Sequence, residues 1–183
     1  MRFFVKKQIV RARVGAFRQA GLTLIETLVS LAIFALVIAG AIVLFNSAST
    51  TQTTAQLASD LQGIRASVKA LYYGQGTYGS STNLNAVLVN GKRVPGSMTV
   101  TAGSPPTINH SLNGTVTVTG NGANFTVALT NIPTAVCVGL MTQQGWDTIQ
   151  VGSAAARTVP VSPATASDDC DNAATQTMTF SST

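Results

Sequence analysis

The pattern of apolar and polar positions changes along the chain, and its first part predicts one long helix. Residues 28–45 contain only one polar side chain, Ser30, and Gly40 interrupts the larger apolar residues. Further on, a single apolar stripe recurs at spacings of three and four, at Leu57, Leu61, Ile64, Val68 and Leu71. That spacing is the helical period. Because no proline precedes Pro95, we expect one helix over about 22–73, ended by the glycines that follow.

The rest of the chain changes to the two-residue period of β-strands. Residues 115–120 and 124–131 alternate on either side of a glycine-rich turn and predict a hairpin. Further strands are expected at 146–152 and 175–181, and short helices near 83–89 and 132–142. Residues 156–171, rich in Pro, Ser and Ala, are expected to form a loop. A long helix followed by strands predicts an α+β fold.

Positive charge is concentrated at the N-terminus. The 183-residue chain has a formal charge of +5. Residues 1–21 hold six of its eleven basic residues and no acid, so the remainder, with five basic and six acidic residues, carries −1. A basic segment before an apolar helix is a topology signal that stays in the cytoplasm, and the remainder gives no support for nucleic-acid binding. The helix over 22–45, about 36 Å long, can span a bilayer.

A secretory signal peptide is a second interpretation of this N-terminus. The small residues at 39–41 could be taken for its cleavage site. The apolar run continues beyond them through Phe45, and the acidic Glu26 lies near the start of the run. A helix that is retained in the mature protein is therefore favoured.

The two cysteines, Cys137 and Cys170, both follow the apolar helix. If that part is exported, an oxidising environment predicts that they form a disulfide. On the chain-entropy description the closed loop would stabilise the fold by about 3.5–4 kcal/mol. A closed zinc site needs four ligands, and two cysteines with the lone His110 cannot supply them.

The remaining polar residues do not predict a catalytic or metal-binding site. Three acids at 168, 169 and 171 could contribute to a calcium site, although acids in a polar loop are more often simply solvated. They are Asp168, Asp169 and Asp171. The sequence shows no nucleophile elbow, phosphate loop or metal motif. We therefore expect no metal, no cofactor and no enzymatic activity.

The most informative residue is Glu26, because an acid inside an apolar helix costs about 2.5–3.5 kcal/mol. Five residues earlier Gly21 closes the basic leader, and the sequence continues as LTLIE into the apolar run. This arrangement resembles the class III signal of type IV prepilins. The resemblance implies that a prepilin peptidase cleaves between Gly21 and Leu22, and that the new amine of Leu22 is N-methylated.

The resemblance also gives Glu26 a role in assembly. A carboxylate in a helix bundle needs a cationic partner, and the amine of Leu22 in a neighbouring subunit would supply one. The alternative is an ordinary signal anchor that happens to contain a glutamate. Gly40 keeps two interpretations: close helix packing, or loss of regular hydrogen bonding in the helix within a filament.

The length of the leader, the non-aromatic Leu22 and the segment 83–100 resemble type IVb pilins, and more narrowly the PilS-type major pilins of thin pili. The resemblance implies the type IV pilin fold, in which the C-terminal half of a long helical spine packs on an antiparallel β-sheet head. It divides the chain into a cleaved leader 1–21, a transmembrane and filament-core helix 22–45, an amphipathic continuation 46–73 and a globular α+β head 74–183 with a disulfide-closed C-terminal region.

The function expected from this resemblance is structural: a major pilin that polymerises into a surface fibre for adhesion, aggregation or conjugative mating contact. Its partners would be copies of itself, the prepilin peptidase, the inner-membrane assembly machinery and, before assembly, the membrane. It would lie in the inner membrane and then in an extracellular fibre of a Gram-negative-type bacterium. A minor pilin, a type II secretion pseudopilin, and a membrane-anchored binding protein or enzyme are the alternatives.

Overall fold

The computed structural model describes residues 23–171 and 173–183. The chain divides into two compact units, Met1–Val43 and Leu44–Thr183. Helix α1, Leu24–Leu71, begins in the first unit and ends in the second. Among the described residues, the second unit contains all the strands and the remaining helices. From here on, the head means this whole unit, Leu44–Thr183.

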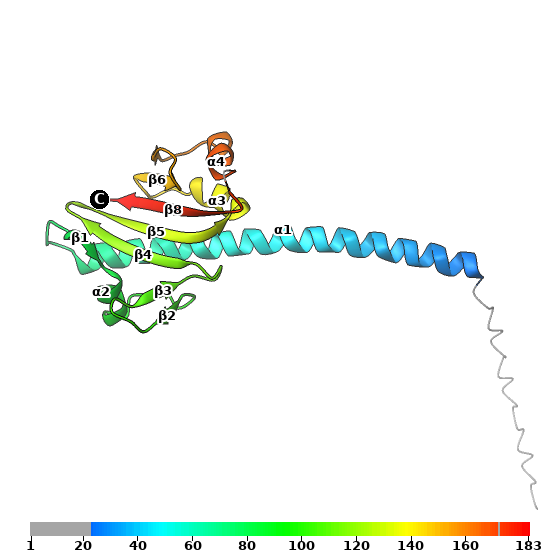
Figure 1. The fold of residues 1–183 in the computed structure, drawn as a ribbon, viewed down its shortest axis with the longest axis horizontal. Coiled ribbons are helices and arrows are strands. Elements are labelled where there is room, and N and C mark those ends of the chain that lie inside the picture. Colours follow the sequence, from blue (N-terminus) through cyan, green and yellow to red (C-terminus); the bar gives the residue numbers. More distant parts are fainter. Residues whose placement is uncertain (1–22, 172) are drawn as a thin grey trace, which may run out of the picture. The chain divides into compact units, whose positions relative to one another are not determined.

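The head alternates short helices with strands (Figure 1). In chain order its further elements are β1 Ser80–Asn83, α2 Asn85–Asn90, β2 Thr99–Thr101, β3 Thr107–Asn109, β4 Thr115–Asn121, β5 Asn124–Pro133, α3 Thr134–Met141, β6 Thr148–Val151, β7 Arg157–Thr158, α4 Pro163–Cys170 and β8 Thr175–Ser182.

The strands form one eight-stranded sheet in the order β2-β3-β4-β5-β8-β6-β7, with β1 also paired to β4. Every pair is antiparallel. The C-terminal strand β8 lies between β5 and β6, so the end of the chain completes the middle of the sheet. Strands β4 and β5 form a hairpin closed by the pair Asn121 and Asn124, and Gly122 adopts a φ of +65° in its turn. Glycine takes that backbone conformation without strain.

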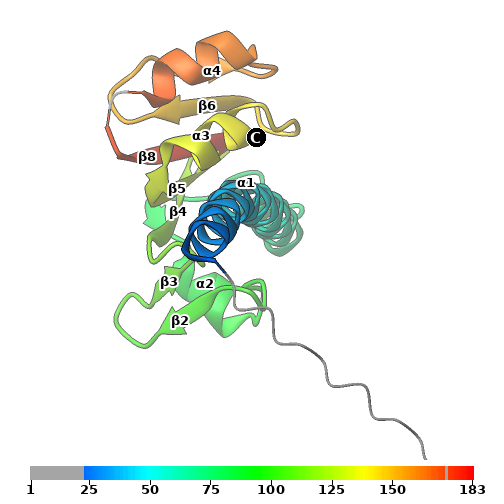
Figure 2. The same cartoon turned by 90° about the vertical axis from the view of Figure 1, so that its right-hand side faces the viewer.

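The sheet has one apolar and one polar face. On the apolar face the stripe of α1 is buried, with Leu57, Leu61, Ile64 and Val68 at most 1% exposed. Figure 2 shows α1 on one side of the column of strands. The alternate positions of β4, β5 and β8 point the other way and are half-buried or exposed. The polar side chains among them include Thr115, Thr117, Thr119, Thr126, Thr130, Thr177, Thr179 and Ser181.

Five aromatic rings form a continuous series of contacts in the head. Successive ring centroids lie 4.9–6.3 Å apart. The rings belong to Tyr72, Tyr78, Phe125, Trp146 and Phe180. Trp146, the single tryptophan of the chain, is 5% exposed and therefore reports on the folding of the head.

The predicted α+β fold is confirmed, as are the long helix, the hairpin, the helices near 83–89 and 132–142, and the strands at 146–152 and 175–181. The loop predicted for 156–171 is wrong, because it contains β7 and α4. Helix α4 begins with a regular signal: Ser162 Oγ accepts a hydrogen bond from the backbone N–H of Thr165, and Pro163 occupies the first turn.

Candidate functional site

The first turn of α1 is closed by Thr23. Its hydroxyl oxygen lies 3.4 Å from the backbone nitrogen of Glu26, and its carbonyl accepts hydrogen bonds from the N–H groups of Glu26 and Thr27. The carboxylate of Glu26 therefore lies where the helix dipole is positive, which favours a negative charge. The spacing Thr-x-x-Glu is that of a capping box, a signal that the sequence interpretation of this segment missed.

After this turn the part of α1 in the first unit exposes apolar side chains on every side. Every described residue of the first unit is exposed. Leu24 is 77% exposed, Leu36 75% and Val43 68%. Soluble monomers rarely expose an apolar surface of this extent, so it indicates contact with a membrane or with other protein chains.

By length and composition, α1 is the one helix among the described residues that could cross a membrane, with a mean hydropathy of 2.9 over its most apolar window. A signal sequence near the N-terminus would have the same properties. Within this stretch Gly40 has open space around it, since no atom lies within 4 Å of where a Cβ would stand. Gly21 and Leu22, the predicted cleavage and methylation positions, lie outside the described residues.

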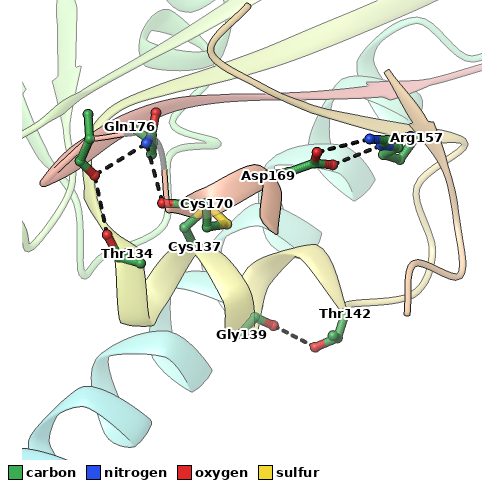
Figure 3. Close-up of a disulfide and its surroundings, with 9 residues drawn as sticks. Thr134, Cys137, Gly139, Thr142, Arg157, Asp169, Cys170 and Gln176 are labelled. Carbon is green, nitrogen blue, oxygen red and sulfur yellow. Dashed lines mark hydrogen bonds and ion pairs between the residues drawn. A yellow bond between two sulfur atoms is a disulfide. The ribbon is translucent and has the colours of Figure 1, made fainter. Parts of the chain in front are cut away.

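Cys137 of α3 and Cys170 of α4 form the predicted disulfide, with their Cα atoms 6.0 Å apart (Figure 3). Both cysteines are fully buried. The carboxamide nitrogen of Gln176 donates to the carbonyl oxygen of Cys170 at 3.3 Å, which ties α4 to the start of β8. The disulfide and this hydrogen bond thus fasten the C-terminal segment to the sheet.

The three acids considered for a calcium site lie in different surroundings. Asp169 accepts two hydrogen bonds from the Arg157 guanidinium, at 2.8 and 2.9 Å (Figure 3). This hydrogen bonding lowers the pKa of Asp169 and raises that of Arg157. Asp168 and Asp171 are exposed. Over residues 23–171 and 173–183 no group of three His, Cys, Asp or Glu side chains could hold a metal ion.

Helices α1 and α3 approach closely at a glycine. A Cβ added to Gly139 would lie 2.7 Å from Cγ2 of Thr54. The Thr54 hydroxyl is itself fixed, because it donates to the carbonyl oxygen of Thr50 at 2.8 Å. An alanine at 139 would require the Thr54 side chain or one of the two helices to shift, a requirement that the sequence pattern did not reveal.

Comparison with known families identifies the chain. The family described as PilS N terminal matches residues 51–183. The chain belongs to the PilS family. A second match, to the prokaryotic N-terminal methylation motif, covers residues 16–42 of this PilS-family chain. The motif implies processing by a prepilin peptidase and polymerisation of the subunits.

Two solved pilins share the fold of this PilS-family chain. A type IVb pilin from Salmonella typhi matches with a TM-score of 0.56 and 22% identity, over 67% of this chain and 95% of that one. TcpA, a type IV pilin from the El Tor biotype of Vibrio cholerae, matches with a TM-score of 0.51 and 14% identity, over 72% of this chain and 99% of that one. No curated protein matches the sequence.

The predicted resemblance is therefore confirmed: the chain belongs to the PilS family, carries the N-terminal methylation motif and has the fold of solved type IV pilins. Its apolar N-terminal helix is consistent with a membrane-anchored prepilin and an extracellular pilus. The structure places Glu26 in the first turn of α1 and joins Cys137 to Cys170. The roles of Gly21, Leu22, Glu26 and Gly40 stay predictions.

Proposed function

We propose that this chain is the major subunit of a type IVb pilus, which polymerises through α1 into a surface fibre used for adhesion, aggregation or conjugative mating contact. The observation that carries the proposal is the methylation motif at 16–42, together with the part of α1 in the first unit, which is apolar and exposed on every side. A head with its own core presents such a helix only if something else covers it.

The proposed assembly contact is an ion pair between subunits. Cleavage after Gly21 frees the amine of Leu22, which is then N-methylated and pairs with Glu26 of a neighbouring subunit. Both charges would otherwise stand unpaired among apolar helices, so pairing fixes the axial position of the incoming subunit. Gly40 would serve close packing of the helices or local loosening of α1 within the filament.

Replacement of Glu26 tests this assembly role. Glu26→Ala should leave cleavage and membrane insertion largely intact and abolish fibre growth, because the Leu22 amine loses its partner. Glu26→Asp, which keeps the charge, is the matched control and should retain part of the fibre yield. The measurements are the intact mass of the membrane-bound subunit and the amount of subunit in sheared fibres. Normal fibres from Glu26→Ala would contradict the proposed contact.

The choice among the alternative functions can be made without a variant. A mature mass that begins at methylated Leu22 supports a pilin, whereas retention of Met1 would support an uncleaved membrane anchor. A subunit that makes up the bulk of sheared fibres is the major pilin. A subunit present there only in traces would instead be a minor pilin or a pseudopilin. Loss of mating, adhesion or aggregation in a strain that lacks the chain identifies which contact the fibre makes.

A further inference from the structure

The imidazole of His110 occupies the turn between β3 and β4 and is only 4% exposed. Its Nε2 lies 2.9 Å from the carbonyl oxygen of Thr130, and its Nδ1 lies 3.3 Å from the backbone nitrogen of Leu112. A carbonyl only accepts a hydrogen bond and an amide N–H only donates one. The neutral ring with its proton on Nε2 therefore satisfies both partners.

The carbonyl that His110 binds belongs to an irregularity in β5. The pairing of β5 with β8 shifts its register between Leu129 and Ile132, and Thr130 and Asn131 have no partner in that register. Such a bulge removes backbone groups from the ladder and leaves them to find other partners. For the carbonyl of Thr130, the ring of His110 is that partner.

Two further side chains hold the turn 110–114 on this bulge. The Asn131 carboxamide donates to the carbonyl oxygen of Leu112 at 2.9 Å, and the Thr130 hydroxyl accepts from the N–H of Thr115 at 2.8 Å. A Cβ at Gly114 would collide with the His110 ring and with the carbonyl oxygen of Thr130. The turn thus fits closely over the ring and shields it from water.

The segments that hold the ring contain no charged residue. The sequence from Val94 to Trp146 contains no Asp, Glu, Lys or Arg, and this stretch includes β2, β3, β4, β5 and α3. The charged residues of α1 within the head have other positions or partners: Asp60 accepts from Gln56, Arg65 donates to Ser182, and Lys69 lies in the last turn. Burial in this neutral setting lowers the pKa of His110.

We propose that His110 is an acid-sensitive latch, whose protonation releases the turn 110–114 from the β5 bulge. A proton added to Nδ1 points at the N–H of Leu112, so two donors face each other and that hydrogen bond is lost. The imidazolium charge also has no carboxylate in the neighbouring strands to balance it. Release of the turn returns the charged ring to water and exposes the half-buried Leu112.

The direction of the pH effect follows from the lowered pKa. The released turn binds a proton more readily than the closed one, so the closed form loses stability as the pH falls below the ordinary histidine range. If only the released form takes up the proton, with an ordinary pKa of about 6.5, its population rises about thirtyfold between pH 7.5 and pH 5.0. Any protonation of the closed form makes the rise smaller.

The test is hydrogen exchange of the full-length protein in detergent micelles at pH 7.5 and pH 5.0, with rates corrected for the intrinsic effect of pH. Peptides over 107–116 should lose up to about thirtyfold in protection, while peptides over β8 should keep theirs. Since His110 is the only histidine, ¹⁵N-histidine labelling reports its ring alone, and the ring should carry its proton on Nε2 at pH 7.5.

The matched variant is His110→Asn. An asparagine side-chain oxygen accepts from the N–H two residues on and does not titrate. This variant should be less protected at pH 7.5, since it lacks the bond to Thr130, and should show no added loss at pH 5.0. A proton on Nδ1, an unchanged protection in the wild type, or an equal loss in His110→Asn would overturn the proposal. The ¹⁵N titration of the wild type decides it even if the variant does not fold.

Discussion

The two parts of α1 carry similar leucines in opposite surroundings. In the first unit Leu36 is 75% exposed, whereas in the head Leu61 is 1% exposed. The stripe that contains Leu61 is covered by strands of the same chain, but no described residue covers the apolar surface around Leu36. The comparison teaches that the stability of the head and the burial of the N-terminal helix depend on different partners. A change in one part should leave the other intact.

Loss of the disulfide is expected to give the largest difference in effect between the head and the first unit. Replacement of both cysteines by alanine removes the bond between α3 and α4 and should lower the free energy of unfolding of the head by about 3.5–4 kcal/mol. Denaturant unfolding followed by the fluorescence of Trp146 measures this loss. The helicity of the first unit in micelles should not change. A head of undiminished stability would show that the sheet holds its C-terminal segment without the disulfide.

Leucine truncation compares the two surroundings directly. Leu61→Ala should destabilise the head by about 3 kcal/mol, because it leaves a cavity under the sheet. Leu36→Ala is the matched control in the same helix, and it should leave the unfolding of the head unchanged while it reduces the yield of fibres. Equal losses of head stability from the two variants would contradict the separation.

Gly139 in the head and Gly40 in the first unit allow the same comparison, with a smaller expected effect. Gly139→Ala brings a methyl group too close to the Thr54 side chain and should cost about 1–2 kcal/mol, even after the gain in helix propensity. Gly40→Ala meets no atom and should leave the melting temperature of the head unchanged. If Gly40 serves packing or loosening within the filament, its replacement should lower only the fibre yield. Melting curves and sheared-fibre yields distinguish the two sites.

The smallest effect is expected at the ion pair of the head. Arg157→Gln removes the guanidinium that lowers the pKa of Asp169, so the variant should melt at a slightly lower temperature at pH 7. The pair stabilises the head above the ordinary aspartate range and loses its effect as the pH falls through the lowered pKa. The melting temperatures of variant and wild type should therefore converge in acid. Asp171→Asn, at an exposed position, is the control.

Periodicity predicted the parts of the fold that are long or strongly alternating. The stripe at Leu57, Leu61, Ile64 and Val68 and the hairpin around Gly122 are visible in the sequence because their side chains must face one core. Strands β1, β2 and β3 were missed, since each has only three or four residues and is held by its neighbours in the sheet. Helix α4 was missed because its polar composition hides the cap at Ser162.

The candidate functional residues were likewise only partly visible in the sequence. Glu26 could be singled out in the sequence because an acid in an apolar run is chemically conspicuous, and its role stays a prediction. The latch at His110 could not, because Thr130 is twenty positions away and is brought to the ring by a bulge that no local pattern marks. The close contact of Gly139 with Thr54 likewise depends on how two helices pack. Contacts between distant segments need the fold before they can be found.

The charge-free stretch from Val94 to Trp146 has a consequence for the survival of the head among digestive enzymes. Trypsin-like proteases cut after Lys or Arg, and the sequence offers them no such residue between Arg93 and Arg157. Most of the sheet lies between these two positions. At the second of them the guanidinium is already bound by Asp169, on an element that the disulfide fastens to α3. Even an unfolded head would therefore leave these enzymes nothing to cut across most of its strands.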